Sequence, residues 1–395
     1  MGARLNTISI EGFKSIRELN AFTLRPLNVL IGANGAGKSN FVDFFRMLRA
    51  MSEEGLANFV REGGGADGFF FDGPKVTPAI KGKLAFAQNQ FRFELTATPS
   101  GELTVKKEET YWEDGSTGWR DYGGGRAESL LKGWRGEEGR YPNTLSIQGH
   151  VADAVSSWMV YHFHDTSPKA PMRRDQSVRD WRELRPDASN LAAFLFRMKG
   201  GEVPQSGGLP PVGAPWHGID ESNYRRIRLM VQLIAPFFDD FLLEPQLRGD
   251  NELIRLEWRQ KGSTFPFQPW HFSDGTMRFI CLATALLQPN PPSTIVIDEP
   301  ELGLHPFALE LLASLIKEAT GGTQIIVSTQ SPSFLNAFEP EDVIVVDRVK
   351  GASCFHRLES EPLREWLNDY TIGELVQKNV IEAGPGEQRP AAGTT

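Results

Sequence analysis

The alternation of apolar and polar residues near the start of the chain predicts two strands and a helix. Residues 7–10 alternate like an edge strand, and residues 24–31 read as a strand that becomes fully apolar toward its end. Residues 41–48 then place phenylalanine and leucine at helical spacing. A buried strand followed by a helix is therefore expected here.

The pattern changes to short alternating segments after this helix. Residues 79–86, 91–97 and 103–111 alternate and are separated by glycine, asparagine and proline, which predicts an antiparallel meander. Residues 113–140 are rich in glycine, tryptophan and arginine without a clear period. The pattern predicts a loop with a short helix there, and it assigns no role to residues 113–150.

The remainder of the chain alternates between helical and extended patterns. Residues 158–163 and 253–258 read as strands, while 190–198 and 224–238 show helical periodicity on either side of a Gly/Pro loop at 200–215. No sustained heptads occur, so we expect no long coiled coil.

Composition narrows the class of protein. With 395 residues, 40% of them hydrophobic, the chain can bury a large core. No apolar run approaches the roughly 20 residues that cross a bilayer, and residues 1–4 lead straight into a strand rather than a secretory signal. We therefore expect a cytoplasmic protein without a membrane partner. A net charge of −8 argues against a protein that binds nucleic acid by bulk positive charge.

A glycine-rich loop joins the predicted buried strand to its helix. The spacing of Gly32, Gly37, Lys38 and Ser39 fits a phosphate loop, in which backbone amides hold phosphates, the lysine reaches the β/γ-phosphates and the serine binds Mg²⁺. A helix N-terminus behind the loop favours the same anion. The predicted nucleotide-binding residues are Gly32, Ala33, Asn34, Gly35, Ala36, Gly37, Lys38, Ser39 and Asn40.

A second apolar run, residues 294–297, ends in two adjacent carboxylates, which is a Walker B arrangement. Asp298 would hold Mg²⁺ together with Ser39, and Glu299 would polarise the attacking water. Taken alone, such a run can also be a strand that ends in a solvated acidic turn. Together with the phosphate loop, it predicts an ATPase that uses ATP and Mg²⁺, with Lys38 and Glu299 as catalytic groups.

Ser273, Asp274 and Gly275 precede an apolar helix predicted at 280–287. This order is similar to the "LSGGQ" signature of ABC-type ATPases, which caps the γ-phosphate of the nucleotide bound to the opposite subunit. A serine hydroxyl, a glycine amide and a helix start supply donors for an anion, although Ser and Asp are also ordinary helix caps. Asp274 stands where the usual pattern has glycine, and it adds a negative charge near the phosphate.

Two further segments match positions of the same family. Residues 324–329 resemble the switch strand, after which many members carry a histidine that contacts the γ-phosphate. This chain has Gln330, which can hydrogen-bond phosphate or orient water but carries no proton; a simple bond to the backbone is the alternative. The Q-loop position lacks a glutamine, and His164 or Asp165 are the candidates there, with buried or capping roles as the alternative.

The full set resembles the RecF/SMC-like branch of ABC ATPases, specifically predicted RecF-like ATPases of the AAA_21 type. It comprises "ISIEGFKS" at 8–15, the phosphate loop, "FSDG", "IVIDEPELGLHP" and "VSTQSP". The resemblance implies an α/β P-loop NTPase with a central mixed sheet, an inserted antiparallel β-lobe and a small helical lobe. The expected division is one ATPase head, 1–382, with a nucleotide-binding core at 1–50 and 250–382, a β-lobe at 75–112, a helical lobe at 165–250, and a disordered tail at 383–395.

The resemblance also implies a function. Two copies would sandwich ATP, each lending Ser273 to the lysine of the other, so we expect an ATP-dependent homodimer acting in DNA repair or genome maintenance. The main alternative is an ATPase sensor subunit of an anti-phage or toxin-like complex, with cleavage left to a separate effector. An ATP-dependent scaffold and a transporter-type ATPase are weaker alternatives, and the absence of an Asn-Lys-x-Asp motif excludes a GTPase.

DNA is a further candidate partner. The densest basic clusters are Arg173, Arg174, Arg179, Arg182 and Arg185, and then Arg225, Arg226 and Arg228. Either cluster could line phosphates, and a solvated helical face explains both equally well.

Overall fold

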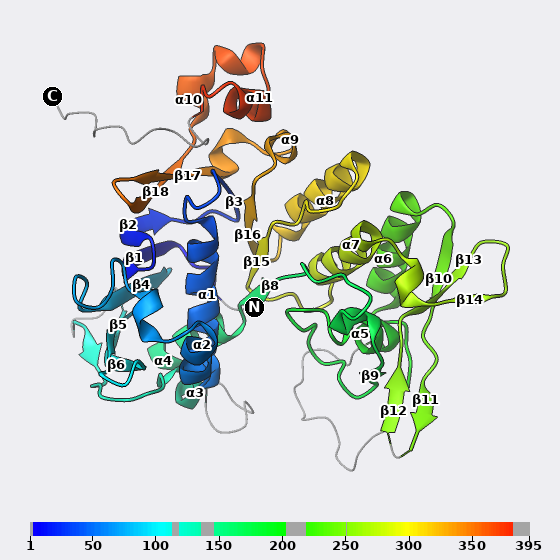
Figure 1. Cartoon of the computed structure of the whole chain (residues 1–395), viewed down its shortest axis with the longest axis horizontal. Coiled ribbons are helices and arrows are strands. Elements are labelled where there is room, and N and C mark those ends of the chain that lie inside the picture. Colours follow the sequence, from blue (N-terminus) through cyan, green and yellow to red (C-terminus); the bar gives the residue numbers. More distant parts are fainter. Residues whose placement is uncertain (1–2, 113–117, 136–145, 203–218, 250, 382–395) are drawn as a thin grey trace. The chain divides into compact units, whose positions relative to one another are not determined.

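The computed structural model describes residues 3–112, 118–135, 146–202, 219–249 and 251–381 (Figure 1). The chain forms two compact units. The first comprises Met1–Val160, Pro292–Asp298 and Thr323–Thr395, and the second comprises Tyr161–Pro291 and Glu299–Gly322. The predicted disordered tail, 383–395, and most of the loop predicted at 200–215 lie outside the described residues.

The first unit contains an antiparallel sheet in the order β2-β1-β4-β5-β6-β7. The strands are β1 (Thr7–Phe13), β2 (Ile16–Thr23), β4 (Ile80–Phe86), β5 (Asn89–Ala97), β6 (Leu103–Trp112) and β7 (Arg120–Asp121). The predicted meander is confirmed as β4, β5 and β6. The prediction of an edge strand at 7–10 is wrong, because β1 pairs with β2 on one side and β4 on the other. Alternation of apolar and polar residues indicates that one face of a strand is buried, but it does not indicate whether the strand pairs with other strands on one side or on both.

The same unit contains a mixed sheet in the order β18-β17-β3-β16-β15-β8. Its strands are β3 (Leu27–Ile31), β8 (Met159–Tyr161), β15 (Thr294–Asp298), β16 (Gln324–Thr329), β17 (Val343–Val349) and β18 (Ala352–Arg357). Strands β15, β16, β3 and β17 are parallel, and β18 is antiparallel to β17. This sheet is the expected central mixed sheet.

The strand predicted at 24–31 starts only at Leu27. The Asn28 side chain accepts a hydrogen bond from the Arg25 amide (3.0 Å) and donates one to the Arg25 carbonyl (2.6 Å), which closes a turn ahead of β3. Pro26 lies within this turn and has no amide to give to a ladder. The apolar residues before Pro26 belong to β2 and to the connection between β2 and β3.

Helix α1 (Lys38–Glu53) carries the main core of the first unit. Its Phe44 ring lies 5.3 Å from Phe13 on β1 and 6.1 Å from Phe93 on β5, between ring centroids, and Phe45 lies 5.2 Å from Trp158. The two contacts of Phe44 fix the helix against the antiparallel sheet. The other helices of the unit are α2 (Leu56–Glu62), α3 (Leu131–Trp134), α4 (Ile147–Ser156), α9 (Pro332–Leu335), α10 (Ser360–Leu363) and α11 (Ile372–Gln377).

The second unit is mainly helical. Its helices are α5 (Leu191–Met198), α6 (Glu221–Ile234), α7 (Asp274–Leu286) and α8 (Pro306–Ala319), and α7 packs against both α6 and α8 (Figure 1). Two small sheets, β10-β13-β14 and β11-β12-β9, complete it. Their strands are β9 (Gln176–Ser177), β10 (Phe238–Leu242), β11 (Gln246–Arg248), β12 (Asn251–Ile254), β13 (Glu257–Gln260) and β14 (Pro266–Phe267).

Two predictions in this unit need correction. The strand predicted at 253–258 is divided between β12 and β13, which belong to different sheets. The helix predicted at 280–287 begins earlier, at Asp274, because Ser273 caps its first turn. Within the described part of the chain, the longest helix is α1, with 16 residues, and none of the helices combines the length and apolar character that a membrane span requires.

Candidate nucleotide site

The predicted phosphate loop joins β3 to α1. Gly35 and Gly37 adopt φ angles of 79° and 118°, which L side chains rarely adopt, and α1 starts at Lys38 directly afterwards. The Lys38 side chain is buried against the loop, and its Nζ donates to the carbonyl oxygens of Gly32 (2.6 Å) and Ala33 (3.2 Å). The first turn of α1 therefore adjoins a fixed ammonium group, and a helix N-terminus beside a positive charge suits an anion.

Ser15 and Ser353 support the phosphate loop through hydrogen bonds. Ser353 Oγ on β18 donates to the Ala36 carbonyl (2.6 Å) and lies 2.6 Å from Ser15 Oγ, which accepts a hydrogen bond from Asn40 Nδ2 (2.6 Å). A Cβ atom at Gly37 would lie 2.0 Å from Ser353 Oγ, so the close approach requires glycine. Sequence reasoning missed Ser353, because nothing local links it to a loop more than three hundred residues earlier.

The register of the parallel strands brings the second motif to the same edge of the sheet. Asp298 on β15 pairs with Ser328 on β16, and Ser328 pairs with Leu30 on β3. Asp298 is buried, and its Oδ1 accepts a hydrogen bond from Ser328 Oγ. The carboxyl ends of parallel strands share one edge, so the phosphate loop and Asp298 are neighbours, as the sequence predicted. Sequence reasoning assigned no role to Ser328.

A chain of charged groups connects this edge to the "GFKS" turn. Lys14, with a φ angle of 48°, places Nζ 2.6 Å from Asp43 Oδ2 on α1. Arg46, one turn further along α1, lies 2.7 Å from Asp43 Oδ1 and 4.0 Å from Asp298 Oδ2. Alternating charges of this kind compensate the buried Asp298 carboxylate.

Glu299 and Gln330 follow the two strands directly. Glu299 adopts a φ angle of 46°, in the left-handed region that non-glycine residues rarely occupy. Such strain recurs at functional sites. Gln330 follows β16 and is exposed, and the next residue, Ser331, caps α9 by accepting a hydrogen bond from the Phe334 amide (3.3 Å).

The predicted signature residues lie at the start of α7, in the second unit. Ser273 is exposed, and its Oγ accepts a hydrogen bond from the Thr276 amide (3.1 Å) and lies 2.8 Å from Thr276 Oγ1. Its geometry is that of an N-cap, and its residue lies at the surface, an arrangement that both the capping and the signature interpretations share. A Cβ at Gly275 would lie 2.2 Å from the Gly303 carbonyl oxygen, so this turn packs directly on the loop after Glu299.

Arg278 ties α7 to two other segments of the second unit. Its guanidinium donates to the carbonyl oxygens of Phe163 (2.9 Å) and His164 (3.1 Å), and to that of Leu302 in the loop after Glu299. Burial lowers the pKa of Arg278 from its ordinary value. Because the bonds are to backbone carbonyls, they fix the position of these segments whatever side chains they carry.

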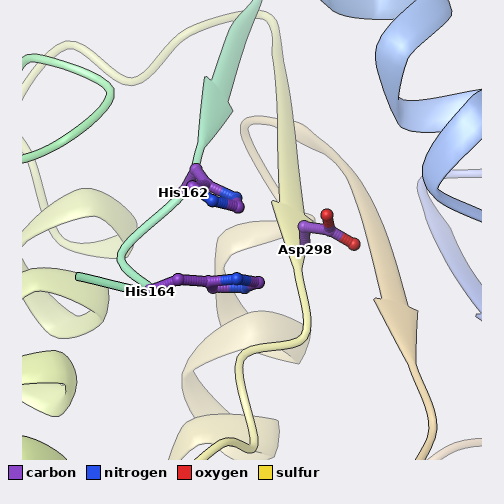
Figure 2. Close-up of side chains that lie close together, drawn as sticks. All are labelled: His162, His164 and Asp298. Carbon is purple, nitrogen blue, oxygen red and sulfur yellow. The ribbon is translucent and has the colours of Figure 1, made fainter.

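The Q-loop candidates follow β8. The rings of His162 and His164 lie 3.9 Å apart between centroids, and Figure 2 shows them after β8, with Asp298 at the end of β15. Asp165 is exposed and accepts a hydrogen bond from the Ser167 amide (3.0 Å). Hydrogen bonds from Ser167 lower the pKa of Asp165, and this local turn matches the capping alternative.

The basic clusters are less available than the sequence suggested. Arg173 is buried, so the hypothesis that it lines nucleic-acid phosphates is wrong. In the second cluster, Arg225 lies 3.1 Å from Glu221 and Arg226 lies 2.6 Å from Glu318. Both of these arginines are therefore paired with carboxylates of the same unit.

Comparisons with known proteins place the chain in a family. It matches the family model described as "AAA domain, putative AbiEii toxin, Type IV TA system" over residues 27–121 and 172–336. It is 24% identical over 399 residues to the Old nuclease of Escherichia phage P2, a match that covers 92% of this chain and 63% of that protein. The chain thus spans less than two thirds of the length of this relative.

Solved structures show the same fold at low identity. The Smc head bound to the C-winged helix domain of ScpA has a TM-score of 0.52 at 15% identity, covering 92% of this chain and 99% of that chain. The Smc head domain with an extended coiled coil bound to the C-terminal domain of ScpA, derived from Pyrococcus furiosus, has a TM-score of 0.50 at 15% identity, covering 93% and 99%. The fold is that of an ABC-type ATPase head, and, since the family model spans both the phosphate loop and the signature segment, the chain belongs to the AAA_21 family.

Proposed function

We propose that the chain binds and hydrolyses ATP. The observation that carries the proposal is the register of β3, β16 and β15, which brings the phosphate loop and Asp298 to one edge of the sheet. Lys38 and the first amides of α1 bind the phosphates, and Glu299, next along the chain from Asp298, orients and deprotonates the attacking water. Gln330 hydrogen-bonds the terminal phosphate or that water.

The residues at this edge fit Mg²⁺. Asp298 offers a buried carboxylate whose other oxygen is held by Ser328, and Ser39 in the first turn of α1 offers a hydroxyl. Oxygen ligands of this type are those that Mg²⁺ takes from proteins beside phosphates. When bound, the ion neutralises charge on the phosphates.

We further propose that two copies form a dimer around ATP. Ser273 is exposed at the first turn of α7, where its hydroxyl is accessible to a second molecule. In this arrangement Ser273 of one copy completes the site built around Lys38 of the other. Each copy is incomplete alone, so the hydrolysis rate per chain rises with protein concentration.

Mixing two inactive variants tests the shared site. Lys38→Ala disables the loop of its own copy, and Ser273→Arg blocks the site of the partner copy. In a mixed dimer both lesions fall on one site and the other site is intact, so an equal mixture regains about a quarter of the wild-type rate under random pairing of a symmetric dimer. If each copy used its own Ser273, the mixture would stay inactive, and the shared site would be refuted.

The biological role has two candidate settings. The RecF resemblance favours a role in DNA repair or genome maintenance. The match to a phage nuclease over 92% of this chain favours the alternative, an anti-phage or toxin-like complex in which ATP turnover controls nuclease action against nucleic acid. ATPase rates with duplex, single-stranded and gapped DNA, together with cleavage assays with and without products of neighbouring genes, separate the two. Stimulation by gapped DNA without cleavage supports repair, and nucleotide-dependent cleavage supports the nuclease setting.

A further inference from the structure

Arg173 is buried beside the first turn of α7 and contacts the chain on both sides of Ser273. It ends the short helix η3 (Pro171–Arg173), and its residue is 3% exposed. Its Nε donates to the Thr166 carbonyl (2.9 Å), and its Nη1 donates to the carbonyls of Pro269 and Phe272 (3.2 Å to Phe272). Its Nη2 lies 3.0 Å from Asp274 Oδ1. The guanidinium thus holds the residues immediately before and after Ser273.

Burial of this charge requires partners. An unpaired buried guanidinium is strongly unfavourable, and its planar set of donors matches several acceptors at once in a way that a lysine does not. Three carbonyl oxygens and the Asp274 carboxylate meet this requirement. The contacts with Phe272 and Asp274 restrict the backbone that carries the Ser273 hydroxyl.

The pair also changes the charge beside Ser273. The Asp274 side chain is 69% exposed, so its carboxylate faces the same solvent as the Ser273 hydroxyl. An isolated carboxylate there would repel a triphosphate. A guanidinium 3.0 Å away offsets that repulsion, which accounts for an acidic residue at a position where the signature usually has glycine.

We propose that Arg173 is a positioning residue for Ser273 and that it compensates the charge of Asp274, so that the first turn of α7 accepts the triphosphate held by a second copy. This inference rests on the ATP-dependent dimer proposed above. Two packing contacts support a fixed geometry. Met172 Sδ lies 3.5 Å from Cys281 Sγ, which holds η3 against α7, and Gly275 packs against Gly303 on the other side.

A double-mutant cycle in the Glu299→Gln background tests the pair. The measured quantity is the Mg-ATP concentration that gives half-maximal dimerisation in sedimentation velocity. Arg173→Met leaves Asp274 uncompensated and raises this concentration about tenfold, a typical coupling for interacting charges. Adding Asp274→Asn restores part of the loss, because no carboxylate remains to be compensated while the bonds to Pro269 and Phe272 stay absent. Arg173→Lys keeps the charge without the planar fork, and it gives an intermediate value.

Controls separate positioning from folding. Thermal unfolding without nucleotide is measured for every variant, since a purely structural role would lower stability and leave the half-maximal concentration of the folded protein unchanged. Arg185 and Asp180 form a matched exposed ion pair 2.7 Å apart, and Arg185→Met with Asp180→Asn leaves dimerisation unchanged. Asp274→Asn alone removes the exposed negative charge and keeps a side-chain oxygen that can accept the bond from Arg173 Nη2, so it gives an unchanged or lower half-maximal concentration.

The outcomes distinguish this inference from the proposed function. If the Glu299→Gln protein stays monomeric in saturating Mg-ATP, the dimer fails and the inference fails with it. If that protein dimerises but folded Arg173→Met matches it, or Asp274→Asn weakens dimerisation, only the role of Arg173 is overturned. If Asp274→Asn does not rescue Arg173→Met, the proposed compensation of the Asp274 charge by Arg173 is refuted.

Discussion

Substitution of single glycines in the phosphate loop separates close packing from backbone strain. A Cβ at Gly32 would lie 2.1 Å from the Val346 carbonyl oxygen on β17, whereas a Cβ at Gly35 meets nothing within 4 Å. Gly35 instead has a φ of 79°, which a non-glycine residue adopts at some cost. Alanine is therefore disfavoured at Gly32 by close contact with backbone and at Gly35 by conformation alone.

The two costs differ in size and in effect. An alanine in the left-handed region costs about 1–2 kcal/mol. Alanine also restricts the unfolded chain, which favours the folded state by about 0.4–1 kcal/mol. Gly35→Ala should therefore lower the free energy of unfolding by about 1 kcal/mol. Val346 lies on β17, the strand between β3 and β18, and its backbone yields little, so Gly32→Ala should lose about 1–3 kcal/mol, as overpacked sites do. It must also displace the loop, and we expect nucleotide affinity to fall about a hundredfold or more, because misplaced amides lose their charge-assisted bonds to phosphate.

Urea unfolding without nucleotide and titration with a fluorescent ATP analogue measure the two effects separately. Gly64→Ala is the matched control, since Gly64 has a φ of 87° and open space around it, away from the loop. It should lose stability like Gly35→Ala and bind nucleotide normally. Equal nucleotide affinity for Gly32→Ala and Gly35→Ala would refute the argument from contact with Val346.

Three further substitutions have defined outcomes. Lys38→Ala should abolish ATP binding in the same titration, with the far-UV circular dichroism unchanged. Ser328→Ala removes the hydroxyl that donates to Asp298 and should cost about 1.5–3 kcal/mol in urea unfolding, as for other bonds to charged groups; an unchanged midpoint contradicts this. Hydrogen bonding from Arg92 holds the pKa of Glu109 below its ordinary 4.5, so its stabilisation is present above that pH and is lost as the pH falls through the lowered pKa. Glu109→Gln should therefore lose about 1 kcal/mol at pH 7, and the difference from wild type should vanish in acid.

The local features of the site were predictable from the sequence. The glycine spacing of the loop and the apolar run before Asp298 report backbone geometry and burial that each segment needs by itself, and both are found where expected. The capping geometry of Ser273 was also readable, because the N-cap preference depends only on the next three residues.

Features that depend on distant partners were not predictable. The support of the loop by Ser353 and the burial of Arg173 arise from contacts across 317 and about a hundred positions of sequence, respectively. An arginine beside other arginines has the same local pattern whether it is solvated or buried. Helix α4 was also missed, because its short amphipathic run follows a stretch without periodicity.

Sedimentation velocity of the Glu299→Gln protein with saturating Mg-ATP tests the central claim most directly. Removal of the Glu299 carboxylate stops hydrolysis and leaves Lys38 and Ser273 in place, so the protein should sediment as a dimer with Mg-ATP and as a monomer with Mg-ADP. The Glu299→Gln, Lys38→Ala double variant should remain monomeric in both. A monomer for Glu299→Gln in saturating Mg-ATP, with nucleotide shown to be bound, would contradict the shared site.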